Sequence, residues 1–332
     1  MNPRIAWLTA LILSYLLAAV PAWAAVEWRM AHKMPPDSSE GKVFQRFADL
    51  VDEYSGGEMK LKMYPNEQLG KTNAVMEQLK LGTVHVYAEG STYMKKWMKD
   101  ITWMSAAFLF DDREHWVRFM STDMVKGWFE KAAEEAGVIQ LGDPTAILRG
   151  PYRVMVTTRD VRSFGDVKGL KLRMHPNQTA IETWTTIGAD VKTLAWTDVY
   201  QAIDKGIVEA VNSPIALVED MRFYEVGPHV IRHDEYYQSI GFMVNQAAYE
   251  KLPDSLKDAI GRAYAAAGEY SHEVMGASAD ASIARMKERG VTFVDVDRAP
   301  FVQVMSEYYR RKEAAGELPE GFLETVEATR NP

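Results

Sequence analysis

The chain has 332 residues, a net charge of -8 and no cysteine. A chain of this length usually needs more than one hydrophobic core, so we expect two lobes. The acidic balance argues against a nucleic-acid partner. The absence of cysteine excludes disulfides, thiolate metal sites and thiol catalysis.

The first residues have the pattern of a secretory signal peptide. Arg4 precedes an apolar stretch over residues 5–20, and small residues stand at Ala22 and Ala24. A membrane anchor is the alternative, but the stretch is shorter than the ~20 residues that a spanning helix needs. We therefore expect residues 1–24 to be removed after about Ala24 and the mature chain to be exported.

Short runs with a period of two alternate with longer runs of helical period, which is typical of an α/β protein. The first half predicts strands over residues 28–32, 59–64 and 84–88, and helices over residues 40–54 and 72–81. Residues 92–136 are predicted to be helical and rich in aromatic residues. We assign four tryptophans of this region to the core: Trp97, Trp103, Trp116 and Trp128.

A second unit of similar rhythm follows. It predicts strands near residue 140 and over residues 152–157, 170–174, 191–196 and 208–214, with helices over residues 177–187 and 197–206. The last hundred residues are predicted to be mainly helical. Residues 254–290 are long enough for one extended or broken helix.

Two arginines twenty positions apart, Arg153 and Arg173, give the first indication of a ligand. A guanidinium is a planar, permanently charged fork of donors that suits a carboxylate. Strand alternation places Arg153 on the face opposite Tyr152 and Val154. Spacing alone favours two solvated arginines at strand ends, because charged side chains are mostly exposed.

Sequence signatures of catalysis are missing. There is no G-x-S-x-G, no H-E-x-x-H, no P-loop and no G-x-G-x-x-G after a strand. The histidine and carboxylates around residues 111–115 are interpreted as a solvated loop, and Lys95 and Lys96 as a solvated helix face. We expect no catalytic residue, no metal and no cofactor.

Several signatures together resemble the extracytoplasmic solute-binding proteins of tripartite ATP-independent periplasmic (TRAP) transporters, in the branch that captures organic acids. The most specific are YPNEQLG at residues 64–70, DVKGLKLR at residues 166–173 and FYEV at residues 223–226. Further matching stretches lie before, between and after these three, and together they cover almost all of the mature chain in the family order.

The resemblance implies a two-lobed α/β clam of the class II periplasmic-binding type. Lobe I would comprise residues 25–149 with contributions from about 235–265, lobe II residues 150–234, and residues 254–332 would form C-terminal helices that pack across both lobes. It also implies a periplasmic protein that captures a small organic carboxylate, such as a hydroxy, sugar or aromatic acid, and delivers it to small and large membrane permease subunits.

The resemblance also implies the site. Arg173 holds the family position that grips the ligand carboxylate in a two-pronged salt bridge, and Arg153 matches a supporting arginine of some members. Four further positions carry over from the family. Trp196 matches an aromatic residue that lines the pocket, and Glu89 matches an acid of lobe I that binds hydroxyls or amines. His32 matches a polar residue at the mouth of the cleft, and Tyr237, beside Tyr236, lies near another wall of the pocket.

The chain departs from the family after the strand that ends near residue 211. Many members read Glu-Asn-Pro there, and an Asn assists the carboxylate, whereas this chain reads Asn212-Ser213-Pro214. Either Ser213 replaces that Asn with a hydroxyl, or Asn212 serves through a shifted turn. Which acid binds is left open.

Three alternatives stay open. The chain could be a periplasmic sensor component that passes a signal to a receptor, or it could bind an amine or zwitterion held by Glu89. An exported hydrolase would need a nucleophile with an oriented base, and the sequence has no motif for one.

Overall fold

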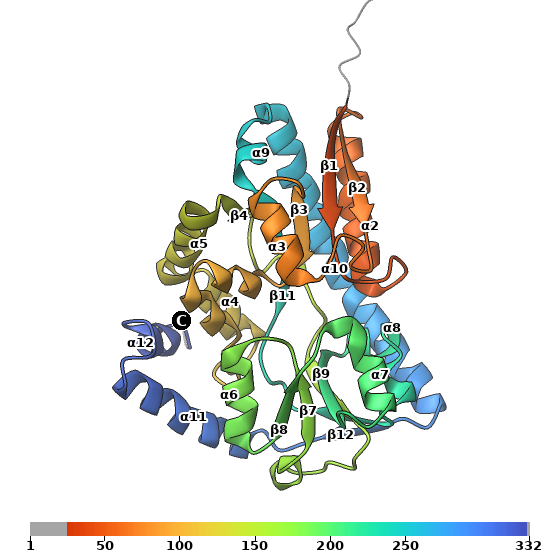
Figure 1. Cartoon of the computed structure of the whole chain (residues 1–332), viewed down its shortest axis with the longest axis vertical. Coiled ribbons are helices and arrows are strands. Elements are labelled where there is room, and N and C mark those ends of the chain that lie inside the picture. Colours follow the sequence, from red (N-terminus) through yellow and green to blue (C-terminus); the bar gives the residue numbers. More distant parts are fainter. Residues whose placement is uncertain (1–24, 331–332) are drawn as a thin grey trace, which may run out of the picture.

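Two β-sheets, each covered by helices, build the two lobes of the chain in a computed structural model that describes residues 25–330 (Figure 1). The architecture confirms the predicted two-lobed α/β fold. The predicted signal peptide, residues 1–24, lies outside the described residues. Among those described, no helix has the length and apolar character to cross a membrane.

The lobe I sheet has the strand order β2-β1-β3-β11-β4, and β5 pairs with β11. Its strands are β1 (Val26–Ala31), β2 (Met59–Tyr64), β3 (Val86–Glu89), β4 (Val138–Gln140), β5 (Ile147–Leu148) and β11 (Ser239–Asn245). β1, β2 and β3 are parallel, and β11 is antiparallel to β3. This lobe therefore takes one of its central strands from a segment that follows lobe II in the chain.

The helices of lobe I are α2 (Ser39–Tyr54), α3 (Thr72–Lys80), α4 (Arg113–Met120), α5 (Asp123–Ala136) and α9 (Gln246–Glu250), with the 3₁₀ segments η1 (Ser91–Lys96) and η2 (Lys99–Ser105). The predicted helical region after residue 92 is thus broken into short pieces. Trp103, Trp116 and Trp128 are buried, and Trp97 packs partly buried against the same core, as predicted.

The lobe II sheet has the order β12-β10-β6-β9-β7-β8. Its strands are β6 (Arg153–Thr157), β7 (Lys171–Met174), β8 (Asp190–Thr193), β9 (Ala210–Pro214), β10 (His229–Arg232) and β12 (Thr292–Asp295). Helices α6 (Gln178–Ile187), α7 (Val199–Asp204) and α8 (Ala216–Asp220) accompany them, with the 3₁₀ segments η3 (Phe164–Val167), η4 (Trp196–Asp198) and η5 (Phe223–Glu225).

The directions of the lobe II strands determine which strand ends lie together and face lobe I. β7 and β9 are parallel, and β6 runs antiparallel to β9 with Arg153 opposite Pro214. The carboxyl ends of β7 and β9 therefore lie at the same sheet edge as the start of β6. This edge faces lobe I (Figure 1).

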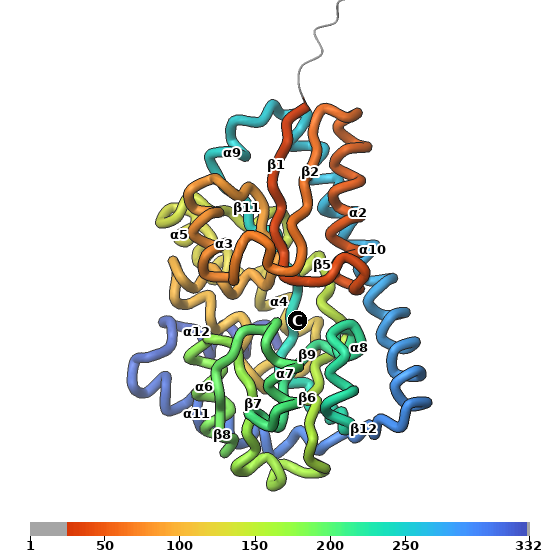
Figure 2. The backbone as a smooth tube through the Cα atoms, turned by 45° about the vertical axis from the view of Figure 1, so that its right-hand side comes forward, coloured from red at the N-terminus to blue at the C-terminus, as the bar shows by residue number. Residues whose placement is uncertain are grey.

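One helix runs along both lobes. α10 (Asp254–Glu288) has 35 residues, so the sequence prediction of a long helix is confirmed as a single unbroken element. It packs against α2 of lobe I and α8 of lobe II (Figure 2). α11 (Ala299–Ala314) then packs against α6, and α12 (Phe322–Ala328) returns to α4, where Val326 O lies 2.9 Å from His115 Nε2.

The first turn of α2 is fixed by a capping residue and by close backbone packing. The Ser38 hydroxyl accepts a hydrogen bond from the Gly41 amide at 3.0 Å and caps the helix. Gly41 packs so close to the preceding loop that a Cβ would lie 2.2 Å from the Pro35 carbonyl oxygen and 2.7 Å from that of Pro36. A glycine is required here, because backbone atoms cannot yield as a side chain can.

Gly41→Ala is expected to lower the free energy of unfolding by about 2 kcal/mol or more, since the backbone clash outweighs the gain in helix propensity of up to ~1 kcal/mol. Gly261→Ala is the matched control, because Gly261 is an exposed helical position with nothing within 4 Å of its added Cβ. Urea denaturation should show a loss in the first variant and a small gain in the second. Equal stability of the two variants would contradict this account of α2.

Candidate ligand-binding site

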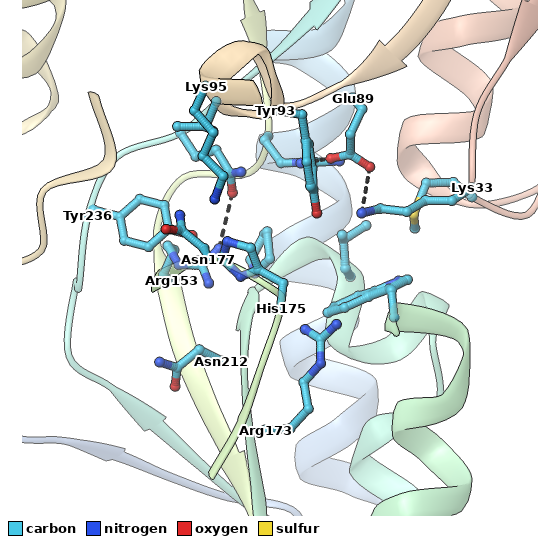
Figure 3. Close-up of a pocket in the computed structure, with 17 residues that line it drawn as sticks. Lys33, Glu89, Tyr93, Lys95, Arg153, Arg173, His175, Asn177, Asn212 and Tyr236 are labelled. Carbon is cyan, nitrogen blue, oxygen red and sulfur yellow. Dashed lines mark hydrogen bonds and ion pairs between the residues drawn. The ribbon is translucent and has the colours of Figure 1, made fainter. Parts of the chain in front are cut away.

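A pocket lies between the lobes, at the sheet edge where β6, β7 and β9 face lobe I (Figure 3). Lobe I and the segments that cross between the lobes contribute Lys33, Met34, Glu89, Thr92, Tyr93, Lys95, Arg149, Tyr236 and Gln238. Lobe II contributes Arg153, Arg173, His175, Asn177, Trp196, Asn212, Pro214 and Leu217. The lining is rich in cations and has one carboxylate, that of Glu89.

Arg173 is a buried cation without a carboxylate partner. Its side chain is 5% exposed, and no carboxylate among residues 25–330 forms an ion pair with it. Nε and one terminal nitrogen donate to the Leu194 carbonyl oxygen at 2.9 and 2.7 Å, and the guanidinium lies 5.4 Å from the centre of the Trp196 ring. Burial lowers the pKa of Arg173 to about 10, so the group is still charged at neutral pH. The remaining guanidinium hydrogens are free for a ligand.

Two further donors of the pocket lining are buried without acceptors. Within the described chain, neither Trp196 Nε1 nor Asn212 Nδ2 has a hydrogen-bond partner. A buried polar group without a partner costs about 1–3 kcal/mol, so native structures rarely leave one unpaired. Both donors belong to the lobe II side of the pocket, as Arg173 does, and both suit an oxygen-rich ligand.

Arg153 is also buried, but an internal acid neutralises it. Its Nε donates to a Glu235 carboxylate oxygen at 3.1 Å, and a terminal nitrogen donates to Gln238 Oε1 at 3.1 Å. The guanidinium lies 4.3 Å from the centre of the Tyr236 ring, where a cation is attracted to the aromatic face. The two arginines are therefore not equivalent: Arg173 keeps an uncompensated charge and Arg153 does not.

Glu89 belongs to a buried chain of charges. Arg149 donates to both carboxylate oxygens of Glu40, at 2.8 and 2.9 Å, and also to Glu89. Lys33 Nζ lies 2.6 Å from the second oxygen of Glu89, and the Gly90 amide donates to the first at 2.8 Å. Burial opposes the ionisation of Glu89, but Arg149 and Lys33 hold its pKa well below the usual range.

The sign of this shift fixes its pH dependence. Since the pKa of Glu89 is lowered in the folded protein, its contribution to stability is present above the pKa of the unfolded chain and is lost as the pH falls towards the folded value.

Arg149 stands between β5 and β6, where the chain passes from lobe I to lobe II. Its ion pairs with Glu40 and Glu89 therefore also hold this crossing segment in place.

Lys95 corrects a sequence interpretation. We predicted a solvated helix face for Lys95 and Lys96, and only Lys96 matches it, since Lys96 is exposed and pairs with Glu77. Lys95 lines the pocket, where burial lowers its pKa to about 8. His175 lies in the same lining, and burial together with the nearby cations keeps its pKa well below the usual value, so it is neutral.

The lobes are in contact across the cleft. The Ser39 amide at the start of α2 donates to an Asp220 carboxylate oxygen of α8 at 2.8 Å. Thr197 Oγ1 of lobe II donates to a Glu67 carboxylate oxygen of lobe I at 2.9 Å. These contacts join lobe I directly to lobe II across the cleft.

The structure separates the predicted site residues into two groups. Arg173, Arg153, Asn212, Trp196 and Glu89 all line the pocket. Of the two residues at the end of β9 that the sequence left open, Asn212 lines the pocket and Ser213 does not.

Three of the predicted residues do not belong to the lining. Ser213 is fully buried, and its hydroxyl donates to the Pro214 carbonyl at 2.9 Å. His32 is 3% exposed and packs edge-on against Phe44 behind the cleft. Tyr237 points away and donates to the Asp111 carbonyl, whereas its neighbour Tyr236 lines the pocket.

Sequence reasoning missed the pocket cations of lobe I, Lys33, Lys95 and Arg149. Each stands just after a strand of the lobe I sheet or in the first 3₁₀ segment beyond it, at the edge that faces the cleft. Only Lys33 carried a signal in the sequence, because it stands directly after the strand predicted over residues 28–32. Arg149 follows β5, which the sequence did not predict, and Lys95 lies several residues beyond its strand.

The model of bacterial extracellular solute-binding protein family 7 matches residues 30–315. The chain belongs to this family. The match covers both lobes and the pocket, and it confirms the family that the sequence resembles.

Characterised relatives of family 7 cover most of the chain. The sialic acid-binding periplasmic protein SiaP of Vibrio cholerae is 25% identical over 296 residues, which cover 89% of this chain and 91% of that protein. The C4-dicarboxylate-binding periplasmic protein DctP of Rhodobacter capsulatus is 24% identical and covers 83% of this chain and 82% of its own.

Solved structures of TRAP periplasmic solute-binding proteins share the fold. A TRAP periplasmic solute-binding protein from Ochrobacterium anthropi with bound L-fuconate has a TM-score of 0.84 and 25% identity, covering 93% of this chain and 100% of its own. A Shewanella oneidensis protein with bound succinate has a TM-score of 0.83 at 18% identity. The alignment covers 93% of this chain and 100% of the Shewanella chain.

Arg149→Met is expected to lower the free energy of unfolding by about 3–5 kcal/mol, because it leaves Glu40 and part of the Glu89 charge buried without a partner. The control is Arg285→Met, which breaks the solvent-screened pair with Glu219 at the surface and should change the free energy of unfolding far less. Urea denaturation at neutral pH measures both. A loss below 1 kcal/mol for Arg149→Met would show that the network does not support the lobe.

Proposed function

We propose that the chain is the extracytoplasmic solute-binding subunit of a TRAP transporter, which captures a small organic carboxylate and delivers it to the small and large subunits of a membrane permease. The observation that carries the proposal is Arg173, a buried guanidinium whose only acceptor within the described chain is a neutral carbonyl. A carboxylate bound to its free edge supplies the missing charge.

The chemistry beside Arg173 supports a carboxylate over other anions. A two-pronged guanidinium–carboxylate pair is planar and satisfies two acceptor oxygens at once. Trp196 Nε1 and Asn212 Nδ2 are donors of the same pocket lining without partners in the described chain, and they can serve further oxygen atoms of the ligand. Closure of the lobes excludes water and strengthens each of these bonds.

The ligands of related structures support the same class. The two TRAP solute-binding protein structures named above hold L-fuconate and succinate, and a third from Pseudomonas putida holds D-glucuronate. All three ligands are small organic acids. The fold of the present chain matches each of these proteins over more than nine-tenths of its length.

A binding role rather than a catalytic one fits the lining. Among the described residues no serine lines the pocket, and the chain has no cysteine, so the usual nucleophiles of acyl transfer are not available there. An amine ligand held by Glu89 is not favoured, because Lys33, Arg149 and the Gly90 amide already occupy that carboxylate.

The cellular setting follows from the same assignment. Residues 1–24 have the pattern of a signal peptide that is cleaved after about Ala24, and the mature chain would act in the periplasm. We place the two lobes at residues 25–149 with part of 235–265, and at residues 150–234. The segments near residues 149–152 and 233–238, which join the two sheets, would then be the hinge for closure.

Arg173→Ala should lose at least about 30-fold in affinity for any organic acid that stabilises the wild-type protein, since breaking a shielded charge pair costs about 2–5 kcal/mol. Arg173→Lys should recover only part of it, because an ammonium cannot form the planar two-pronged pair. Thermal-shift screening with L-fuconate, galactonate, D-glucuronate and succinate, followed by calorimetry, measures the effect.

The control for this experiment is Arg162→Ala, which removes an exposed lobe II arginine that pairs with Asp160 outside the pocket. It should bind as the wild type does. Unchanged acid affinity in a folded Arg173→Ala variant would refute the carboxylate assignment.

A further inference from the structure

The cations of the pocket outnumber the carboxylates that pair with them. Five cationic side chains line it: Lys33, Lys95, Arg149, Arg153 and Arg173. Three carboxylates form ion pairs with members of this set: Glu40, Glu89 and Glu235. Since the neutral His175 adds no charge, the site as described carries an excess of two positive charges.

The excess is localised on two side chains. Within residues 25–330 neither Arg173 nor Lys95 forms an ion pair, whereas Lys33, Arg149 and Arg153 each do. Lys95 also has no hydrogen-bond partner in the described chain, and burial is the sole cause of its lowered pKa. No internal group therefore compensates the ammonium of Lys95.

The two unpaired cations belong to different lobes. Lys95 stands on η1 of lobe I, and Arg173 on β7 of lobe II. Figure 3 shows Lys95 reaching into the pocket from above, toward Asn177 and Arg153, while Arg173 reaches into it from below. A ligand that contacts both would touch both lobes.

We propose that the ligand carries two anionic groups, the first bound by Arg173 and the second by Lys95, so that Lys95 makes the site selective for dianions over monoanions. This inference rests on the proposed function, because it takes the Arg173 carboxylate contact as given. It adds a specificity-determining residue and narrows the ligand to diacids or to acids with a second negative substituent.

The physical reason is the cost of leaving a partly buried cation without a counter-charge. When a monoanion binds Arg173, the ammonium of Lys95, which is partly exposed, stays partly desolvated and unpaired. A dianion compensates both, removes their mutual repulsion and links lobe II to lobe I. The second anionic group therefore contributes to affinity and to the stability of the closed form.

The test uses acids matched in shape and differing by one charge: succinate against its monoamide succinamate, glutarate against glutaramate, and galactarate against galactonate. Calorimetry at neutral pH measures each affinity for the wild type, Lys95→Gln and Lys96→Gln. Lys96→Gln is the control, because Lys96 is the adjacent lysine but lies outside the pocket and pairs with Glu77.

We expect at least one diacid to bind the wild type about tenfold or more tightly than its monoanionic partner, and Lys95→Gln to abolish that difference by weakening the diacid alone. Lys96→Gln should keep it. The inference is overturned if no diacid of the panel binds more tightly than its partner, or if Lys95→Gln weakens both members of a pair equally.

The outcome is distinguishable from failure of the proposed function. If monoanions and diacids bind equally and Arg173→Ala abolishes both, the carboxylate assignment stands and the role of Lys95 is wrong. If Arg173→Ala changes neither, the proposed function itself fails.

Discussion

The uncompensated charge of Arg173 is the constraint on which the account of this site depends. An arginine 5% exposed would ordinarily be paired with an acid, because removing a guanidinium from water costs several kcal/mol. Here the guanidinium rests on the Leu194 carbonyl and the Trp196 ring, which position it but do not neutralise it. The fold thus holds a cation ready for a ligand anion.

The rest of the pocket makes this arrangement stable. Arg153 and Arg149 are buried nearby, yet Glu235, Glu40 and Glu89 compensate them, so the positive field of the pocket is concentrated where the chain offers no acid. Strand topology brings these groups together, since the ends of β7 and β9 and the start of β6 share one sheet edge. α10 and the crossing segments hold that edge against lobe I.

Length and local pattern in the sequence were sufficient for the two-lobed α/β fold, most strands and the long C-terminal helix. They did not single out Arg173, because spacing alone favours a solvated arginine and only the family resemblance implies a place for it in the site. They were also insufficient where partners come from distant segments. Glu235, the acid that neutralises Arg153, lies 82 positions away in the sequence. A shift of one residue in a strand or turn also changes which neighbour lines the pocket, and the structure places Asn212 and Tyr236 there rather than Ser213 and Tyr237. Lys95 and Lys96 are adjacent and chemically identical, so only the three-dimensional course of η1 shows which one enters the pocket.

The most direct test of the central claim is a crystal structure of the protein with the acid that stabilises it most in a thermal-shift screen. We expect a ligand carboxylate with two oxygens about 2.7–2.9 Å from Arg173 guanidinium nitrogens. Asn212 Nδ2 or Trp196 Nε1 should donate to the same end of the ligand. A bound acid whose carboxylate lies away from Arg173, with that guanidinium still bonded only to Leu194, would contradict the central claim.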